Sequence, residues 1–250
     1  MKKVALITGS SGGIGIALAR AYLDDGYFVI GLDRNSSEFL ALDAYVHIDV
    51  NLLMFSKEAP YRKNILEKIK EYLPRQVSNF VLINNAAEQI LRPMAEIQWQ
   101  DWEDSLAVNT VAPFFLVQGL TEELILSRGH VINISSIHAK LTKTKFTCYG
   151  AAKAALESIT RSLALELSPF GISVNTVAPA AISTKMLEAG FHGKPEKLRN
   201  LESYHPSNSI GAPANLALFV KTITDRQDGF LTGTILEYNG GIACRLHDPD

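Results

Sequence analysis

A glycine-rich turn near the N-terminus is the feature that most limits what this chain can fold into. The apolar run VALITG at 4–9 predicts a buried strand, TGSSGGIG at 8–15 predicts a tight turn, and apolar spacing over 16–23 predicts a helix. Such a turn lets the backbone approach a pyrophosphate, and the helix N-terminus offers it free N–H groups. The alternative is a loop rich in glycine and serine that binds no ligand.

A second predicted strand, at 27–32, favours the binding interpretation. It ends in Asp33, eighteen residues after Gly15. An acidic side chain at this place can bind the ribose hydroxyls of a dinucleotide. The two segments together therefore predict a dinucleotide site at the start of the chain.

Strand and helix patterns alternate along the rest of the chain. Apolar runs predict strands near 4–8, 27–32, 45–48, 80–84, 130–135, 172–177 and 234–237, and helical spacing predicts helices near 14–24, 60–73, 99–109, 112–127, 150–167 and 213–223. This alternation predicts an α/β fold, a doubly wound parallel sheet of Rossmann type with helices on both faces. We expect one domain over 1–250, with a substrate lid near 180–212, where the periodicity is lost.

Composition and charge exclude several classes of protein. The formal net charge of −2 offers no nucleic-acid surface, and no apolar run approaches the ~18 residues of a membrane span. The start, MKKVALITGSS, has too few apolar residues for a signal peptide. Two cysteines, Cys148 and Cys244, are too few for a disulfide framework. We expect a cytoplasmic protein with no membrane or nucleic-acid partner and no metal site.

The run CYGAAK places Tyr149 and Lys153 four residues apart. Positions i and i+4 share one face of a helix, so the ammonium can lie near the phenol. A nearby cation favours the phenolate and lowers the pKa of the tyrosine, which makes Tyr149 a candidate general acid and base. The alternative is an ordinary solvated helix face.

A series of motifs links the turn to this pair. They are TGSSGGIG at 8–15, DV at 49–50, NNAA at 84–87, Asn109 in VNT, ISS at 134–136, YGAAK at 149–153 and NTVAP at 175–179. Ser136 lies thirteen residues before Tyr149. In this order and spacing the chain resembles the short-chain dehydrogenase/reductase family over nearly its whole length.

The resemblance implies a catalytic role for four residues. Tyr149 would give or take the proton of the reacting hydroxyl, and Lys153 would hold down the pKa of the tyrosine and bond the nicotinamide ribose. Ser136 would donate a hydrogen bond to the carbonyl oxygen. Asn109 would help to hold a water that relays protons to the lysine.

The resemblance also implies a nicotinamide cofactor, with NAD preferred to NADP. Asp33 would repel the 2′-phosphate of NADP, although Arg34 could pair with that phosphate or stack on the adenine. Asp49 and Val50 resemble the pair that recognises adenine. The expected cofactor contacts are Gly9, Ser11, Gly13, Ile14, Gly15, Asp33, Arg34, Asp49, Val50, Asn85, Ala86, Tyr149, Lys153, Pro179, Ile182 and Thr184.

The expected substrate is a small polar secondary alcohol or its ketone, either a hydroxy acid or a sugar or polyol. The residues expected to face it are Gln89, Ser136, His138, Phe146 and Tyr149. Gln89 and His138 would supply hydrogen bonds, whereas Phe146 would add apolar surface. Two alternatives stay open: a non-catalytic NAD(P)-binding sensor or scaffold, and an NADP-dependent ketone reductase.

The helices predicted at 112–127 and 150–167 carry apolar residues around much of their circumference. One stripe can cover the sheet, while a second, with Ala154 and Leu165, needs another partner. Relatives pair these helices between subunits, and closed symmetry is the common outcome. We therefore expect a homotetramer.

Overall fold

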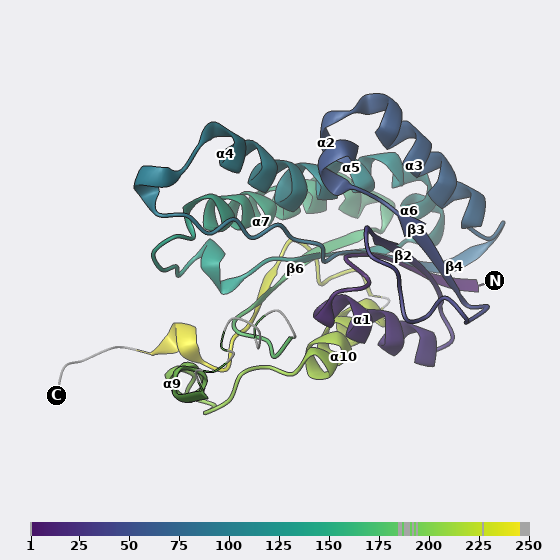
Figure 1. The fold of residues 1–250 in the computed structure, drawn as a ribbon. Coiled ribbons are helices and arrows are strands. Elements are labelled where there is room, and N and C mark those ends of the chain that lie inside the picture. Colours follow the sequence, from purple (N-terminus) through teal and green to yellow (C-terminus); the bar gives the residue numbers. More distant parts are fainter. Residues whose placement is uncertain are drawn as a thin grey trace.

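A seven-stranded parallel sheet runs through the centre of the molecule, with strand order β3-β2-β1-β4-β5-β6-β7 (Figure 1). The computed structural model describes residues 2–184, 187, 191, 193, 195–226 and 228–245. The strands are β1 (Lys2–Thr8), β2 (Phe28–Asp33), β3 (Tyr45–Asp49), β4 (Val77–Asn84), β5 (His130–Ile134), β6 (Ser173–Pro179) and β7 (Ile235–Tyr238). The predicted doubly wound parallel sheet is confirmed, and the strand order reverses direction between β1 and β4.

Helices cover both faces of the sheet, as Figure 1 shows. They are α1 (Gly13–Asp24), α2 (Leu52–Lys57), α3 (Ala59–Tyr72), α4 (Trp99–Leu106), α5 (Ala112–Gly119), α6 (Thr121–Ser127), α7 (Thr147–Leu167), α9 (Pro195–Tyr204) and α10 (Pro213–Thr224). Helices α1 and α10 pack on one face, and α3, α5, α6 and α7 pack on the other.

Alternate residues of each strand point to opposite faces of the sheet. In β4, Leu82 belongs to the core under α3, α5 and α7, whereas Val81 and Ile83 belong to the core over α1 and α10. A strand buried on both faces must be apolar at nearly every position. This requirement explains why unbroken apolar runs identified the strands.

The helices differ from the prediction in three places. Helix α2 was not predicted, and Asn51 caps it by accepting hydrogen bonds from the amides of Leu53 and Met54. The helix expected at 112–127 is divided at Leu120, where ψ is 17°. The helix expected at 99–109 passes into a π-helical turn, Ala107–Val111, which joins α4 to α5.

The two ends of the segment expected to form a lid, near residues 181–183 and at Gly211, are hydrogen-bonded to each other just after β6. Ser183 N donates to Gly211 O at 2.8 Å, and Gly211 N donates to Ala181 O at 2.9 Å. Helix α9 lies inside the segment. Residues 185, 186, 188–190, 192 and 194 of the proposed lid lie outside the described residues. In the described part of the chain, no helix is long and apolar enough to cross a bilayer.

Candidate active site

The predicted site residues gather at the carboxyl ends of the strands, on both sides of the point where the strand order reverses. Ligands of open α/β sheets bind in the crevice at this point. Strand β1 leads into the glycine turn, β4 ends at Asn84, β5 leads into Ser135 and Ser136, and β6 ends at Pro179. Because the sheet is parallel, these residues share one edge of it.

The glycine turn is packed so closely that side chains are excluded from it. Gly9 has a φ of +66°, and a Cβ there would lie 2.9 Å from the Cα of Ala86. A Cβ at Gly15 would overlap the carbonyl oxygen of Gly9, and one at Gly13 would lie 2.8 Å from Cγ2 of Thr184. Helix α1 then begins at Gly13 with no acidic residue in its first turn. The turn is therefore a backbone cradle suited to a phosphate group.

The loop after β4 supports this cradle. The amides of Asn85 and Ala86 donate to Oγ1 of Thr8 at 2.9 and 3.0 Å. The side-chain amide of Asn85 also donates to the carbonyl oxygens of Thr8 and Gly9, at 3.0 and 3.2 Å. Asn85 and Ala86 therefore fix the shape of the glycine turn, which their sequence motif alone did not reveal.

The ends of β2 and β3 bring together the residues expected at the adenosine. The carboxylate of Asp33 accepts hydrogen bonds from the amides of Ser11 and Asn35, at 3.0 and 2.9 Å. Asp33 lies opposite Asp49 in the sheet, and the next residue, Val50, is buried. The Asp33 carboxylate is thus held beside the glycine turn.

Arg34 makes a contact that the sequence did not predict. Its guanidinium forms an exposed ion pair of 3.5 Å with Glu88, from the loop after β4. Glu88 is itself fixed by Asn109, whose side-chain amide donates to Glu88 O at 2.8 Å and whose oxygen accepts from Glu88 N at 3.2 Å. The fully buried Asn109 lies in the π-helical turn. Its side chain therefore positions the loop that follows NNAA.

Tyr149 and Lys153 lie one turn apart on α7, as expected. The ammonium of Lys153 lies 5.8 Å from the centroid of the Tyr149 ring and donates to Ile134 O at 2.8 Å. Lys153 is only 1% exposed and Tyr149 only 7%. Both groups are therefore shielded from solvent at the end of β5.

The expected lowering of the tyrosine pKa requires a correction. Burial raises the pKa of Tyr149, and a hydrogen bond with the Ser136 side chain opposes that rise. Burial also lowers the pKa of Lys153 to about 7, against the opposing charge of Glu157. For Tyr149 the cost of burying charge outweighs the hydrogen bond with Ser136, and Ser136 is the group that favours the phenolate in this structure.

Ser136, His138, Phe146 and Tyr149 form the expected substrate side of the site. The rings of His138 and Phe146 stack with centroids 4.1 Å apart, and both meet the ring of Tyr149 edge-on at 6.2 and 6.1 Å. Burial and the charge of Lys143 lower the pKa of His138 to about 4. His138 is therefore neutral near pH 7, when one ring nitrogen can donate a hydrogen bond and the other can accept one.

Gln89 is not brought into this aromatic group. It is exposed on the loop after β4. The same loop reaches the segment before α7, because Arg92 N donates to Lys145 O at 3.2 Å. Sequence reasoning also missed Glu157, which lies one turn beyond Lys153 and accepts a hydrogen bond from Oγ of Ser135 at 2.9 Å. Its i+4 spacing from Lys153 was the available signal.

Comparison with known proteins agrees with this geometry. A family model described as short chain dehydrogenase matches residues 3–194. The 3-oxoacyl-[acyl-carrier-protein] reductase FabG of Haemophilus influenzae is 30% identical over 242 residues, covering 96% of this chain and 98% of that protein. The 3beta-hydroxysteroid dehydrogenase 1 of Eggerthella lenta is 27% identical over 246 residues, covering 96% and 93%.

Among solved structures, the ligand-free aldohexose dehydrogenase of Thermoplasma acidophilum has a TM-score of 0.87 and 27% sequence identity. The match covers 100% of this chain and 98% of that one. The family model matches residues 3–194, and the relatives and the solved structure match nearly the whole chain. The chain belongs to the short-chain dehydrogenase/reductase family, and it is an NAD(P)-dependent dehydrogenase or reductase.

Proposed function

We propose that this protein is an NAD-dependent oxidoreductase that interconverts a small polar secondary alcohol and its ketone. The observation that carries the proposal is the Tyr149 phenol, buried with the Ser136 hydroxyl and the Lys153 ammonium at the same edge of the sheet as the glycine cradle. Such a group can move a proton to or from a substrate oxygen while water is excluded.

Each residue then has a role in the reaction. The hydride would be supplied or accepted by a bound nicotinamide. In the reduction direction Tyr149 gives its proton to the carbonyl oxygen, while Ser136 donates a hydrogen bond to the same oxygen as negative charge develops there. Lys153 retains two N–H groups besides the one that meets Ile134 O, and these are available to a ribose hydroxyl. Asn109 keeps the loop after β4 in place.

NAD is the proposed cofactor because of the charges at the end of β2. The Asp33 carboxylate is held beside the glycine turn by two amides, and it would repel a 2′-phosphate. The neighbouring cation, Arg34, is paired with Glu88. The alternative, use of NADP, requires Arg34 to leave Glu88 for the phosphate.

A sugar-like or polyol alcohol is the substrate class that the pocket favours, with a hydroxy acid second. A neutral His138 hydrogen-bonds a hydroxyl without repelling or strongly attracting charge. Phe146 places an apolar ring beside it. By their names, the relatives act on substrates as different as an acyl carrier conjugate, a steroid and an aldohexose. Overall sequence identity therefore does not identify the substrate, and the residues around Tyr149 must be used instead.

The test is a substrate panel followed by NADH absorbance. It contains acetoacetate, dihydroxyacetone and D-fructose for reduction, with 3-hydroxybutyrate, glycerol, sorbitol and D-glucose for oxidation. Turnover of one class by the wild type, absent in Tyr149→Phe, supports the proposal. NADH binding without turnover of any compound favours the non-catalytic sensor or scaffold instead.

We further propose a cytoplasmic homotetramer built on the outer sides of α6 and α7. Leu126 is 85% exposed and Leu165 is 79% exposed, and both lie on helices whose other side covers the sheet. Exposed leucines on two helices that cover the same face of the sheet suit contact with a second copy. Light scattering at micromolar concentration tests this, and a monomeric mass contradicts it.

A further inference from the structure

A carboxylate next to the catalytic pair takes no direct part in the proposed proton transfer. Glu157 lies on α7, one turn after Lys153 and two turns after Tyr149. Residues i, i+4 and i+8 lie along one face of a helix. All three side chains therefore face the end of β5.

Three consecutive residues at the end of β5 each hold one member of this row. Ile134 O accepts a hydrogen bond from the Lys153 ammonium at 2.8 Å. Oγ of Ser135 donates to the Glu157 carboxylate at 2.9 Å. The next residue, Ser136, carries the hydroxyl that hydrogen-bonds Tyr149.

Ser135 connects the row more closely still. Its Oγ also lies 3.4 Å from the carbonyl oxygen of Lys153, and its amide donates to Val177 O of β6 at 2.8 Å. A movement of Ser135 would therefore displace both Lys153 and Ser136. Glu157 is the acceptor that fixes the rotamer of the Ser135 hydroxyl.

Other charges act on Glu157: those of Arg161 and Lys140 lower its pKa, and that of Glu237 raises it. Glu157 lines a cavity of about 210 Å³ together with Ser136, Lys140 and Glu237. Lys140, which follows the short turn Ile137–Ala139, is already paired with Glu237 of β7 at 2.9 Å. Arg161, on the next turn of α7, is exposed. Lys153, by contrast, is buried, and it lies one turn before Glu157 on the same helix.

We propose that Glu157 is a positioning residue, whose carboxylate fixes Ser135 and supplies the negative charge that keeps the buried Lys153 protonated. This inference rests on the proposed function of Tyr149 and Lys153. Burial lowers the pKa of Lys153 to about 7, and Glu157 is the charge that opposes this fall. Burial also raises the pKa of Glu157, while the Ser135 hydrogen bond opposes that rise.

The test is the pH profile of kcat/KM for NADH oxidation, with whichever of acetoacetate, dihydroxyacetone and D-fructose is turned over fastest. In this direction Tyr149 must be protonated and Lys153 must be positively charged. Activity therefore falls as the pH rises through the lower of the two pKa values. Glu157→Gln keeps a hydrogen-bond acceptor for Ser135 but removes the charge. We expect this variant to move the alkaline limb to lower pH by about 0.5–1 pH unit.

Two further variants isolate the charge. Glu166→Gln removes a carboxylate from an exposed position of the same helix, and its profile should coincide with that of the wild type. Glu157→Asp retains the charge, so its limb should stay close to the wild-type position even if kcat falls. If Glu157→Gln does not fold, as judged by circular dichroism, Glu157→Ala is assayed and interpreted in the same way.

Failure of the inference and failure of the proposed function give different results. A Glu157→Gln profile that coincides with the wild type, with Tyr149→Phe inactive, overturns the role of Glu157 alone. Turnover by Tyr149→Phe within a few-fold of the wild type overturns the proposed function itself. An equal loss of activity at every pH in Glu157→Gln also contradicts the inference, because it indicates a purely structural role.

Discussion

Tyr149 is the residue on which the chemistry depends. Tyr149→Phe removes the phenol and keeps the ring, so the contacts with His138 and Phe146 are retained. Loss of a general acid and base costs about 10²–10⁴-fold, and we expect kcat to fall by at least about 100-fold. Binding of NADH, followed by fluorescence, should be unchanged. Substantial turnover by the variant removes Tyr149 from the mechanism.

Asp33 is a second single residue with a specific expected role, the preference for NAD over NADP. Asp33→Ser removes the negative charge that faces a 2′-phosphate, so that Arg34 can exchange Glu88 for the phosphate without opposition from Asp33. We expect the ratio of kcat/KM with NADP to that with NAD to rise by about tenfold or more, equivalent to about 1.4 kcal/mol. Asp43→Ser, an exposed change elsewhere on the surface, is the control. A wild type that already prefers NADP contradicts the assignment.

At the scale of secondary-structure elements, the sequence predicted those strands and helices that depend on a local sequence pattern. The strands were recovered because both of their faces are buried, and α1 was recovered because a glycine turn precedes it. The division at Leu120 and the π-helical turn at Ala107–Val111 were not predicted, since tertiary packing decides them. The pairing of Arg34 with Glu88 was missed for the same reason: 54 residues separate the partners.

The π-helical turn gives a prediction for the element that it positions. Asn109→Ala leaves the amide and carbonyl of Glu88 without their side-chain partner. Loss of a partner for buried polar groups costs about 1–3 kcal/mol. We expect a loss of this size in the free energy of unfolding by urea, together with a raised KM for NADH because the loop beside the glycine turn loosens. Unchanged stability and unchanged KM would show that Asn109 does not hold this loop.

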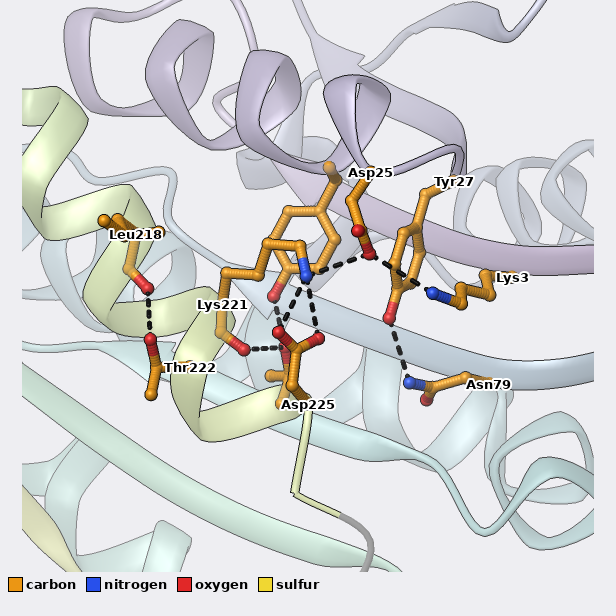
Figure 2. Close-up of polar contacts among 10 residues, drawn as sticks. Lys3, Asp25, Tyr27, Asn79, Leu218, Lys221, Thr222 and Asp225 are labelled. Atoms are coloured by element: carbon orange, nitrogen blue, oxygen red, sulfur yellow. Dashed lines mark hydrogen bonds and ion pairs between the residues drawn. The ribbon is translucent and has the colours of Figure 1, made fainter.

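At the scale of the whole molecule, the end of the sheet opposite the active site carries an ionic cluster that ties α1, α10 and β1 together. Figure 2 shows the ammonium of Lys221 between Asp25 and Asp225, at 2.9 and 2.7 Å, with Lys3 also paired to Asp25 at 3.2 Å. Lys221 also lies 5.8 Å from the centroid of the Tyr27 ring. The side chain of Lys221 is only 11% exposed, whereas its partners are about half exposed. The cluster therefore serves stability and lies far from the chemistry.

Lys221→Met should lower the free energy of unfolding by about 1 kcal/mol, a modest value because water screens the two carboxylates. The hydrogen bond from Lys221 lowers the pKa of Asp25. A carboxylate whose pKa is lowered by folding stabilises the folded protein at pH values above its unfolded pKa of about 3.9. This stabilisation is lost as the pH falls through the folded-state pKa. Urea denaturation at pH 7 and pH 3 should therefore show a difference from wild type that shrinks in acid.

Lys63→Met, at an exposed pair on α3, should change stability by less than about 0.5 kcal/mol. Both variants should keep the wild-type kcat. A fall in kcat for Lys221→Met without a loss of stability would mean that this end of the sheet is coupled to the active site.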